Sequence, residues 1–181
     1  MEQSVVLDVN DVLETYRYFV PTTKLKLLNL RQWLPLEMDS ELAEKSAYLV
    51  AKVMGDGNLD KSFTCRFIGQ FNDLNRLKGL IISEYSLNES SLTMTFRKAR
   101  GESYLLQVND SLFGRFLYAL GAPIGNKTRN EFLVPPWIKS SRKCSRSFLQ
   151  ALFDDELATI KIKRACFFKG VGFKLCKAEA F

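Results

Sequence analysis

The sequence has no histidine among its 181 residues, and its four cysteines form no C-x-x-C pair: Cys65, Cys144, Cys166 and Cys176. Together these absences exclude a zinc finger, a Ser-His-Asp triad and a Cys-His nucleophile. Any acid–base chemistry would therefore depend on carboxylates, lysines, tyrosines or metal-bound water.

Long apolar runs are also lacking. None reaches the roughly 18–20 residues that span a bilayer, and Met1-Glu-Gln-Ser4 has no basic start before an apolar core, as a secretory signal would. We therefore expect a soluble, cytoplasmic protein without a membrane partner. The 46% hydrophobic content and 14 phenylalanines indicate a globular chain. The net charge of +6 is compatible with a polyanionic partner but is weak evidence by itself.

Two apolar runs that end in carboxylates organise the chain. Tyr48-Leu-Val-Ala-Lys-Val-Met-Gly-Asp-Gly57 and Phe148-Leu-Gln-Ala-Leu-Phe-Asp-Asp-Glu156 match at a constant offset of 100. At this offset Leu49 falls on Leu149, Ala51 on Ala151 and Asp56 on Glu156. A run that occurs twice in this way suggests two related halves that meet through their helices.

The acids at the ends of these runs break a preference. A helix C-terminus carries partial negative charge, so an acid there costs about 0.3–1 kcal/mol. A hard divalent cation with oxygen ligands would offset this cost and the repulsion between the two acids. The alternative is that Gly55-Asp-Gly57 is a turn and Asp154-Asp-Glu156 a solvated helix end. In either case Gly57 is predicted to end its helix in a left-handed conformation.

The two runs resemble the paired motifs of the LAGLIDADG homing endonucleases, with residues 49–57 and 149–157 at the nine motif positions. Three further segments are similar to this family and lie in the expected order: Pro35–Leu42, Leu120–Lys127 and Val134–Ile138. The resemblance covers residues from about 35 to about 157.

This resemblance implies an α+β fold with a pseudo-twofold helix pair and a curved antiparallel sheet. Residues 1–38 would be an N-terminal extension, which either docks on the domain or contacts DNA; 39–139 would be the first half. Residues 140–181 would hold the second motif helix and an incomplete second repeat, since only 25 residues follow Glu156. Self-association that completes the sheet is the alternative to a monomer with two motifs.

Site residues also follow from the resemblance. Asp56 and Glu156 would bind Mg²⁺ or another divalent cation, and Lys98 or Arg97 would neutralise charge during catalysis. Double-stranded DNA would lie on the sheet face and contact six residues: Lys61, Arg66, Arg97, Lys98, Arg100 and Lys127. The helix interface would contain Ala51, Gly55, Ala151 and Asp155. Leu157 and Asp155 depart from the motif, which places glycine and a small residue there.

The function implied is a site-specific DNA endonuclease that makes metal-dependent double-strand cuts, as enzymes associated with introns and inteins do. The alternative is a nucleic-acid-binding protein of the same fold that no longer cleaves, like a maturase or a regulator.

Local patterns predict most secondary structure between the motifs. Helices are expected at Asn10–Phe19, Asp73–Ile82 and Ser111–Leu120, a strand at Lys61–Gln70, and a hairpin from Leu92–Lys98 and Tyr104–Val108. Thr23–Trp33 fits either a strand or an amphipathic connector. Further strands are expected at Ala158–Phe168 and Gly172–Cys176.

Overall fold

A computed structural model describes residues 4–16, 18–98, 103–127 and 132–157, the side chains of 155–157 excepted. The fold is α+β, as predicted. The helices are α1 (Val9–Glu14), α2 (Thr22–Arg31), α3 (Glu41–Met54), α4 (Phe71–Tyr85), α5 (Ser111–Ala119), α6 (Pro136–Ser140) and α7 (Arg142–Leu157). The strands are β1 (Val5–Leu7), β2 (Leu36–Glu37), β3 (Asn58–Leu59), β4 (Cys65–Gly69), β5 (Leu92–Arg97) and β6 (Ser103–Val108).

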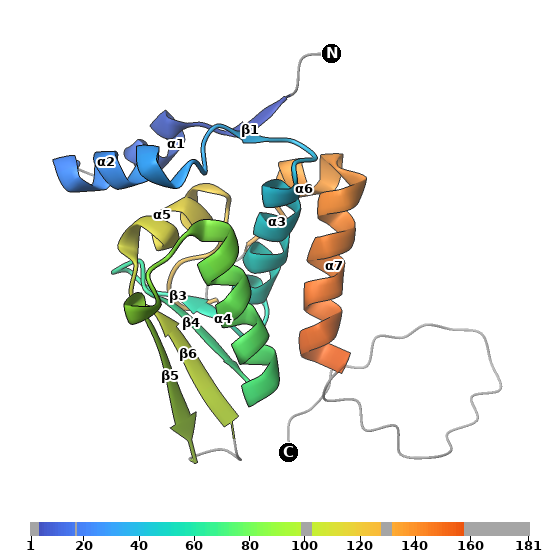
Figure 1. Ribbon diagram of the computed structural model, residues 1–181. Helices are drawn as coiled ribbons and strands as arrows, with labels where there is room; N and C mark the ends of the chain where they lie inside the picture. Colours follow the sequence, from blue (N-terminus) through green and yellow to red (C-terminus); the bar gives the residue numbers. More distant parts are fainter. Residues whose placement is uncertain (1–3, 17, 99–102, 128–131, 158–181) are drawn as a thin grey trace.

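The two predicted motif helices, α3 and α7, lie side by side (Figure 1). Ser40 begins α3 by accepting a hydrogen bond from the Ala43 amide, as expected of an N-cap. Ala47 and Ala51 of α3 and Ala151 of α7 are fully buried. Because alanine has no side chain beyond Cβ, two helices that meet at alanines can approach closely. Phe148 of α7, which is close to Ala151 in sequence, is also buried.

The main sheet is antiparallel with the strand order β3-β4-β6-β5. One face carries buried residues from all four strands, among them Leu59, Phe67, Leu106 and Leu92. The other face carries polar and half-buried residues, because side chains alternate between the faces of a strand. In Figure 1 α4 runs across the sheet and α3 lies between the sheet and α7. The residues of α3 and α4 that face the sheet join its apolar face in one core. On the second face, called the open face below, the described residues Ile68, Thr93 and Thr95 are exposed.

The N-terminal residues pack on α5. Trp33 is buried, donates a hydrogen bond from its indole to the Tyr85 carbonyl at 3.1 Å, and contacts the rings of Phe113 and Phe116. Arg31 forms an ion pair with Asp110 at 2.5 Å. Since Asp110 also caps α5 through the amides of residues 112 and 113, the N-terminal residues are tied to the start of that helix. The segment Thr23–Trp33, for which the sequence left a strand or an amphipathic connector open, lies mostly in helix α2.

The other local predictions hold with shifted ends. The hairpin β5–β6 and the helices α1, α4 and α5 form at the predicted places. Only the second half of the predicted strand at 61–70 is a strand, because residues 60–64 form a turn. The strands predicted after residue 157 lie outside the described residues. Within the described part of the chain, no helix is long and apolar enough to cross a membrane.

Two helical glycines provide a matched test of this packing. A Cβ at Gly114 of α5 would lie 2.0 Å from the Phe63 carbonyl oxygen, whereas a Cβ at Gly79 of α4 would meet nothing within 4 Å. We expect Gly114→Ala to lower the free energy of unfolding by about 1–3 kcal/mol through overpacking. Gly79→Ala should raise it by about 0.5–1 kcal/mol, because alanine has the higher helix propensity. Urea denaturation measures both, and equal effects would contradict the packing described.

Candidate functional site

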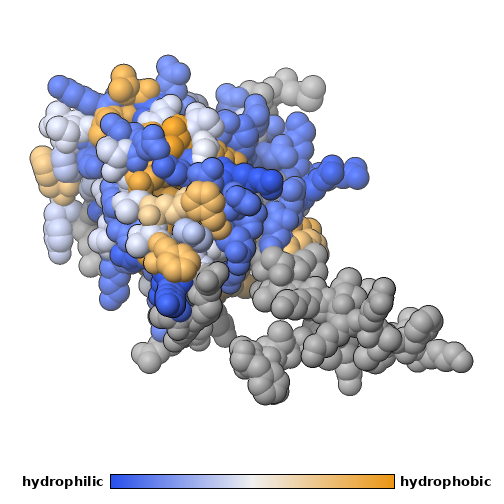
Figure 2. All heavy atoms as spheres, turned by 60° about the horizontal axis from the view of Figure 1, so that its bottom comes forward, coloured by the Kyte–Doolittle hydropathy of each residue, from blue (hydrophilic) through white to orange (hydrophobic). Residues whose placement is uncertain are grey.

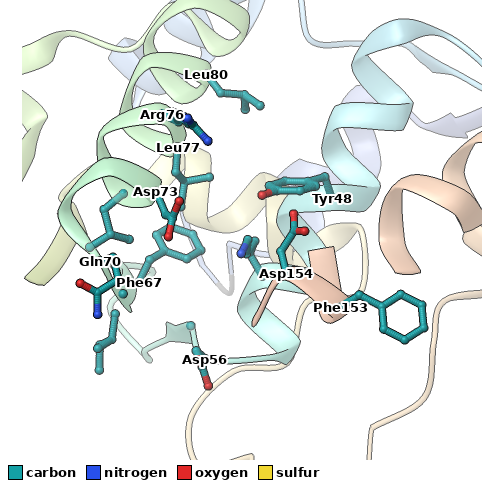
Figure 3. A pocket seen from close by; sticks show the side chains of 15 residues that line it. Tyr48, Asp56, Phe67, Gln70, Asp73, Arg76, Leu77, Leu80, Phe153 and Asp154 are labelled. Carbon is teal, nitrogen blue, oxygen red and sulfur yellow. The ribbon is translucent and has the colours of Figure 1, made fainter. Parts of the chain in front are cut away.

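A groove of about 660 Å³ lies where the C-terminal ends of α3 and α7 meet β4 and α4. Its floor is apolar, with Phe67, Leu74, Leu77 and Leu80. Its charged lining consists of Asp56, Asp73, Asp154, Lys52 and Arg76, and Tyr48 contributes a phenol (Figure 3). Of these, only Asp56 belongs to the predicted catalytic set.

The matched acids Asp56 and Glu156 differ in the secondary structure of their backbones. Helix α3 ends at Met54, so Asp56 lies beyond the helix and is exposed. Helix α7 continues to Leu157, so Glu156 belongs to its last turn. In Figure 3 the Asp154 carboxylate points toward Tyr48, whereas the Asp56 carboxylate points away from both at the far border of the groove. The side chains of Asp155, Glu156 and Leu157 lie outside the described residues, so the Asp56–Glu156 pair stays a prediction.

Gly57 explains why α3 ends earlier than α7. The prediction of a left-handed Gly57 is wrong, because among the described glycines only Gly121 and Gly125 have positive φ, at 99° and 82°. The reason for glycine at 57 is close approach: a Cβ there would lie 2.5 Å from the Lys52 carbonyl oxygen. The Gly57 amide donates to that same oxygen at 2.8 Å. Leu157, at the matching position, has the Cβ that such a turn forbids, and α7 remains helical through it.

Lys127 caps the C-terminus of α3. Its ammonium donates hydrogen bonds to the carbonyls of Val53 at 2.9 Å, Met54 at 3.2 Å and Gly55. Terminal carbonyls of a helix have no partner within the helix and carry partial negative charge. A cation from a loop more than 70 residues away therefore neutralises the charge for which the sequence argument had invoked a metal.

The donor set near Asp56 only partly fits a divalent cation. Carboxylates are suitable ligands for Mg²⁺, and three aspartates line the groove. Within the described ranges, however, no group of three or more Cys, Asp or Glu side chains is close enough to hold a metal ion. Because the Lys127 ammonium already binds the carbonyls at the end of α3, those oxygens are poorly placed to add ligands. Mg²⁺ binding at Asp56 and Glu156 stays a prediction.

Four of the predicted DNA-binding residues lie on or beside the open face of the sheet, whereas Lys127 caps α3. Arg66 of β4 and Arg97 of β5 lie on the open face of the sheet, since the register pairs Arg66 with Gln107, Gln107 with Thr93, and Arg97 with Ser103. Lys61 is exposed in the turn before β4 and Lys98 is exposed after β5. Arg100 lies outside the described residues. Neither Arg97 nor the predicted catalytic Lys98 lines the groove, whose basic residues are Lys52 and Arg76.

A dense hydrogen-bond network holds the turn beside the open face. The Asp60 carboxylate accepts from the Ser62 amide at 2.8 Å, from the Thr64 amide at 3.1 Å, and from Arg66 at 2.6 Å. Burial raises the pKa of Asp60, but the hydrogen bonds from Ser62, Thr64 and Arg66 outweigh it and lower this pKa to about 2. Arg66 also donates to Gln107 at 3.2 Å. The turn therefore orients Arg66 on the open face.

The groove contains residues that sequence reasoning missed, among them Tyr48, Lys52, Asp73 and Arg76. Tyr48 and Lys52 lie one helical turn apart and pair through a cation–π contact at 5.5 Å. The spacing of Asp73 and Arg76 at i and i+3 was available in the sequence, but their position facing α3 depends on tertiary packing. Of the predicted interface residues, Ala51 and Ala151 are fully buried as expected, and Gly55 is half-buried.

The cap on α3 can be tested by removing its charge. Lys127→Met keeps much of the side-chain length but leaves the three carbonyls without their donor, so we expect a loss of about 1.5–3 kcal/mol in the free energy of unfolding. The matched control is Lys78→Met, which removes an exposed ion pair with Glu89 and should cost less than about 1 kcal/mol. Denaturant unfolding measures both, and equal losses would argue against the cap.

Acid titration tests the Asp60 network. The pKa of Asp60 is about 2 in the folded protein and about 3.9 in an unfolded chain. Its contribution is therefore fully present above about pH 4 and is lost as the pH falls toward 2. We expect Asp60→Asn to lower stability at pH 7 and to flatten the loss of stability between pH 4 and 2, measured by thermal unfolding. The Ser62 hydroxyl also donates to the Asp60 carboxylate, at 2.5 Å. Ser62→Ala removes this donor and keeps the amide, so it should give an intermediate profile; unchanged acid dependence in both variants would refute this account.

Comparisons with known proteins show similarity to parts of much longer chains. The chain is 30% identical over 197 residues to "DNA-directed RNA polymerase subunit Rpo1N" of Methanocaldococcus jannaschii, a match that covers 98% of this chain and 15% of that protein. It is 31% identical over 130 residues to "Replication factor C small subunit" of the same organism, a match that covers 67% of this chain and 7% of that protein. It is 29% identical over 167 residues to "tRNA-splicing ligase RtcB" of this organism, a match that covers 82% of this chain and 17% of that protein.

These findings correct the predicted function. No family model matches the chain, so the resemblance to the LAGLIDADG family gains no support there. The relatives carry the names of a polymerase subunit, a replication factor and a ligase, which contradicts the prediction of a site-specific homing endonuclease. All three names refer to proteins that act in processes on nucleic acid. The chain spans less than a fifth of the length of each relative.

Proposed function

We propose that this chain is a nucleic-acid-binding module that uses the open face of the β3-β4-β6-β5 sheet, with double-stranded DNA as its ligand. The observation that carries the proposal is a row of hydrogen-bonding side chains that crosses all four strands. The register aligns Asn58, Arg66, Gln107 and Thr93 on this face. Neighbouring positions on the same face add Thr95 and Arg97.

The chemistry of the row suits base edges. In duplex DNA the major groove presents donors, acceptors and methyl groups in a pattern that differs for each base pair. Amide, guanidinium and hydroxyl groups are the side chains that read this pattern, and two-stranded ribbons fit the groove. Ile68 (41% exposed) on the same face offers apolar contact for a thymine methyl. Exposed Lys61 and Lys98 at the margins supply cations for phosphates.

The relatives support the class of partner. Three differently named proteins share this segment, and it makes up 7–17% of each. A segment common to a polymerase subunit, a replication factor and a ligase does not account for what distinguishes their activities. It fits better with a property they have in common, and all three names refer to processes on DNA or RNA.

Fluorescence anisotropy with a labelled DNA duplex tests the proposal. We expect wild type to bind, and affinity to fall linearly with salt on a log–log scale because released counterions drive phosphate contacts. Arg97→Ala should weaken binding about tenfold, and Gln107→Ala should reduce discrimination between duplex sequences more than it reduces average affinity. EDTA should leave binding unchanged, because the open face is not expected to need a metal.

A charge-matched control separates this face from general basicity. Lys78→Ala removes one positive charge from α4, on the covered side of the sheet, and should leave affinity within about twofold of wild type. Duplex RNA of the same sequence should bind more weakly, since its major groove is too narrow for side chains to read. Equal losses for Lys78→Ala and Arg97→Ala, or no binding by wild type at low salt, would overturn the proposal.

A further inference from the structure

We propose that three aromatic rings at the end of the covered sheet face form a stacking site for unpaired nucleobases. They are Phe71 at the start of α4, Tyr104 of β6 and Phe96 of β5. The ring centroids of Phe71 and Tyr104 lie 5.2 Å apart, and those of Phe96 and Tyr104 also lie 5.2 Å apart. This inference rests on the proposed nucleic-acid partner and adds a second mode of contact, with a single strand.

The register places these rings beyond the cover of the helices. Gly69, Tyr104 and Phe96 form the last row of this face that all three strands share. Phe71, two residues beyond Gly69, contacts the Tyr104 ring. In the neighbouring row of the same face, Phe67 and Leu106 are buried under the helices. The apolar core therefore continues past its cover and ends in exposed rings.

Packing in the core does not explain why Phe71 and Phe96 are aromatic, because about half of each side chain is exposed. Phe71 is 48% exposed and Phe96 is 49% exposed. Both meet Tyr104 in a T-shaped arrangement, with interplanar angles of 60° and 61°, so Tyr104 covers at most one face of each phenylalanine. A free ring face is the surface on which a nucleobase stacks. Figure 2 turns this end of the molecule forward and shows apolar side chains set among hydrophilic ones.

A cation next to the rings favours nucleic acid over an apolar ligand. Lys98, two residues after Phe96, is exposed, and Arg97, whose side chain lies on the open face, is exposed at the same end of β5. In the part of the chain that the structure describes, neither forms an ion pair. Gln70, which directly precedes Phe71, is exposed and offers an amide at the edge of the groove. Among the described residues, the exposed acid nearest to Phe71 in sequence is Asp73. Aromatic faces beside backbone-tracking cations are the combination that binds single strands without sequence preference.

A tryptophan reporter tests the site directly. In Phe96→Trp the new indole is exposed, whereas Trp33 is buried and Trp137 is half-buried. Binding of a ten-residue oligothymidylate should quench its fluorescence, because a stacked base contacts the ring. An abasic oligomer of the same length and charge should bind more weakly and quench little. Equal quenching by both oligomers would overturn the inference.

Alanine variants give the second measurement. We expect Phe71→Ala and Phe96→Ala each to weaken oligothymidylate binding about five- to tenfold, without changing the salt slope, since no phosphate contact is lost. Phe96→Tyr should restore affinity. Phe153→Ala removes a ring of similar exposure (55%) on α7 and should have no effect. Thermal unfolding of each variant identifies any loss caused by misfolding.

The outcomes separate this inference from the proposed function. If duplex binding persists in both alanine variants and oligothymidylate binding does not fall below that of Phe153→Ala, the stacking site is refuted while the open sheet face stands. If wild type binds neither duplex nor single strand, both proposals fail together. Loss of single-strand affinity in Phe71→Ala and Phe96→Ala, with duplex affinity retained, supports both.

Discussion

The close contact between α3 and α7 determines where every other part of the site lies. Helix α3 is central: it packs on α7 along one side and contacts β3, β4 and α5 along the other. The buried alanines at 47, 51 and 151 let the two helices approach. Because both helices end near β4 and α4, their C-terminal ends form one wall of the groove. A larger residue at any of these alanines would overpack the contact between the two helices that form this wall.

The partial negative charge at the C-terminus of α3 was correctly identified from the sequence, but more than one kind of cation can offset it. The sequence places an acid two residues beyond the helix end, where the helix dipole disfavours it. A divalent cation would offset this charge, and so would any other cation that reaches the terminal carbonyls. The fold uses the ammonium of Lys127. Local sequence could not reveal this, since Lys127 reaches α3 only after the chain has completed the sheet and α5.

Local patterns in the sequence predicted local structure well. The hairpin β5–β6 and the helix at 111–120, which ends before Gly121, follow from spacing and turn chemistry. Errors arose where tertiary contact decides. Gly57 was interpreted through backbone conformation, but it is required by the close approach of the Lys52 carbonyl. The Asp60 turn shortened β4, because its hydrogen bonds replace the strand ladder there.

Register explains why the site itself was harder to predict than the fold. Alternation along one strand shows which residues share a face, but only pairing shows which residues of different strands become neighbours. Arg66 and Gln107 are 41 positions apart in sequence and hydrogen-bond on the open face. Phe71, Tyr104 and Phe96 come from three elements and meet in one row of rings. One sheet therefore presents polar side chains on its open face and aromatic rings at the end of its covered face. In the two proposals made above, these surfaces would serve different ligands, since base edges of a duplex are read by hydrogen bonds and unpaired bases are held by stacking.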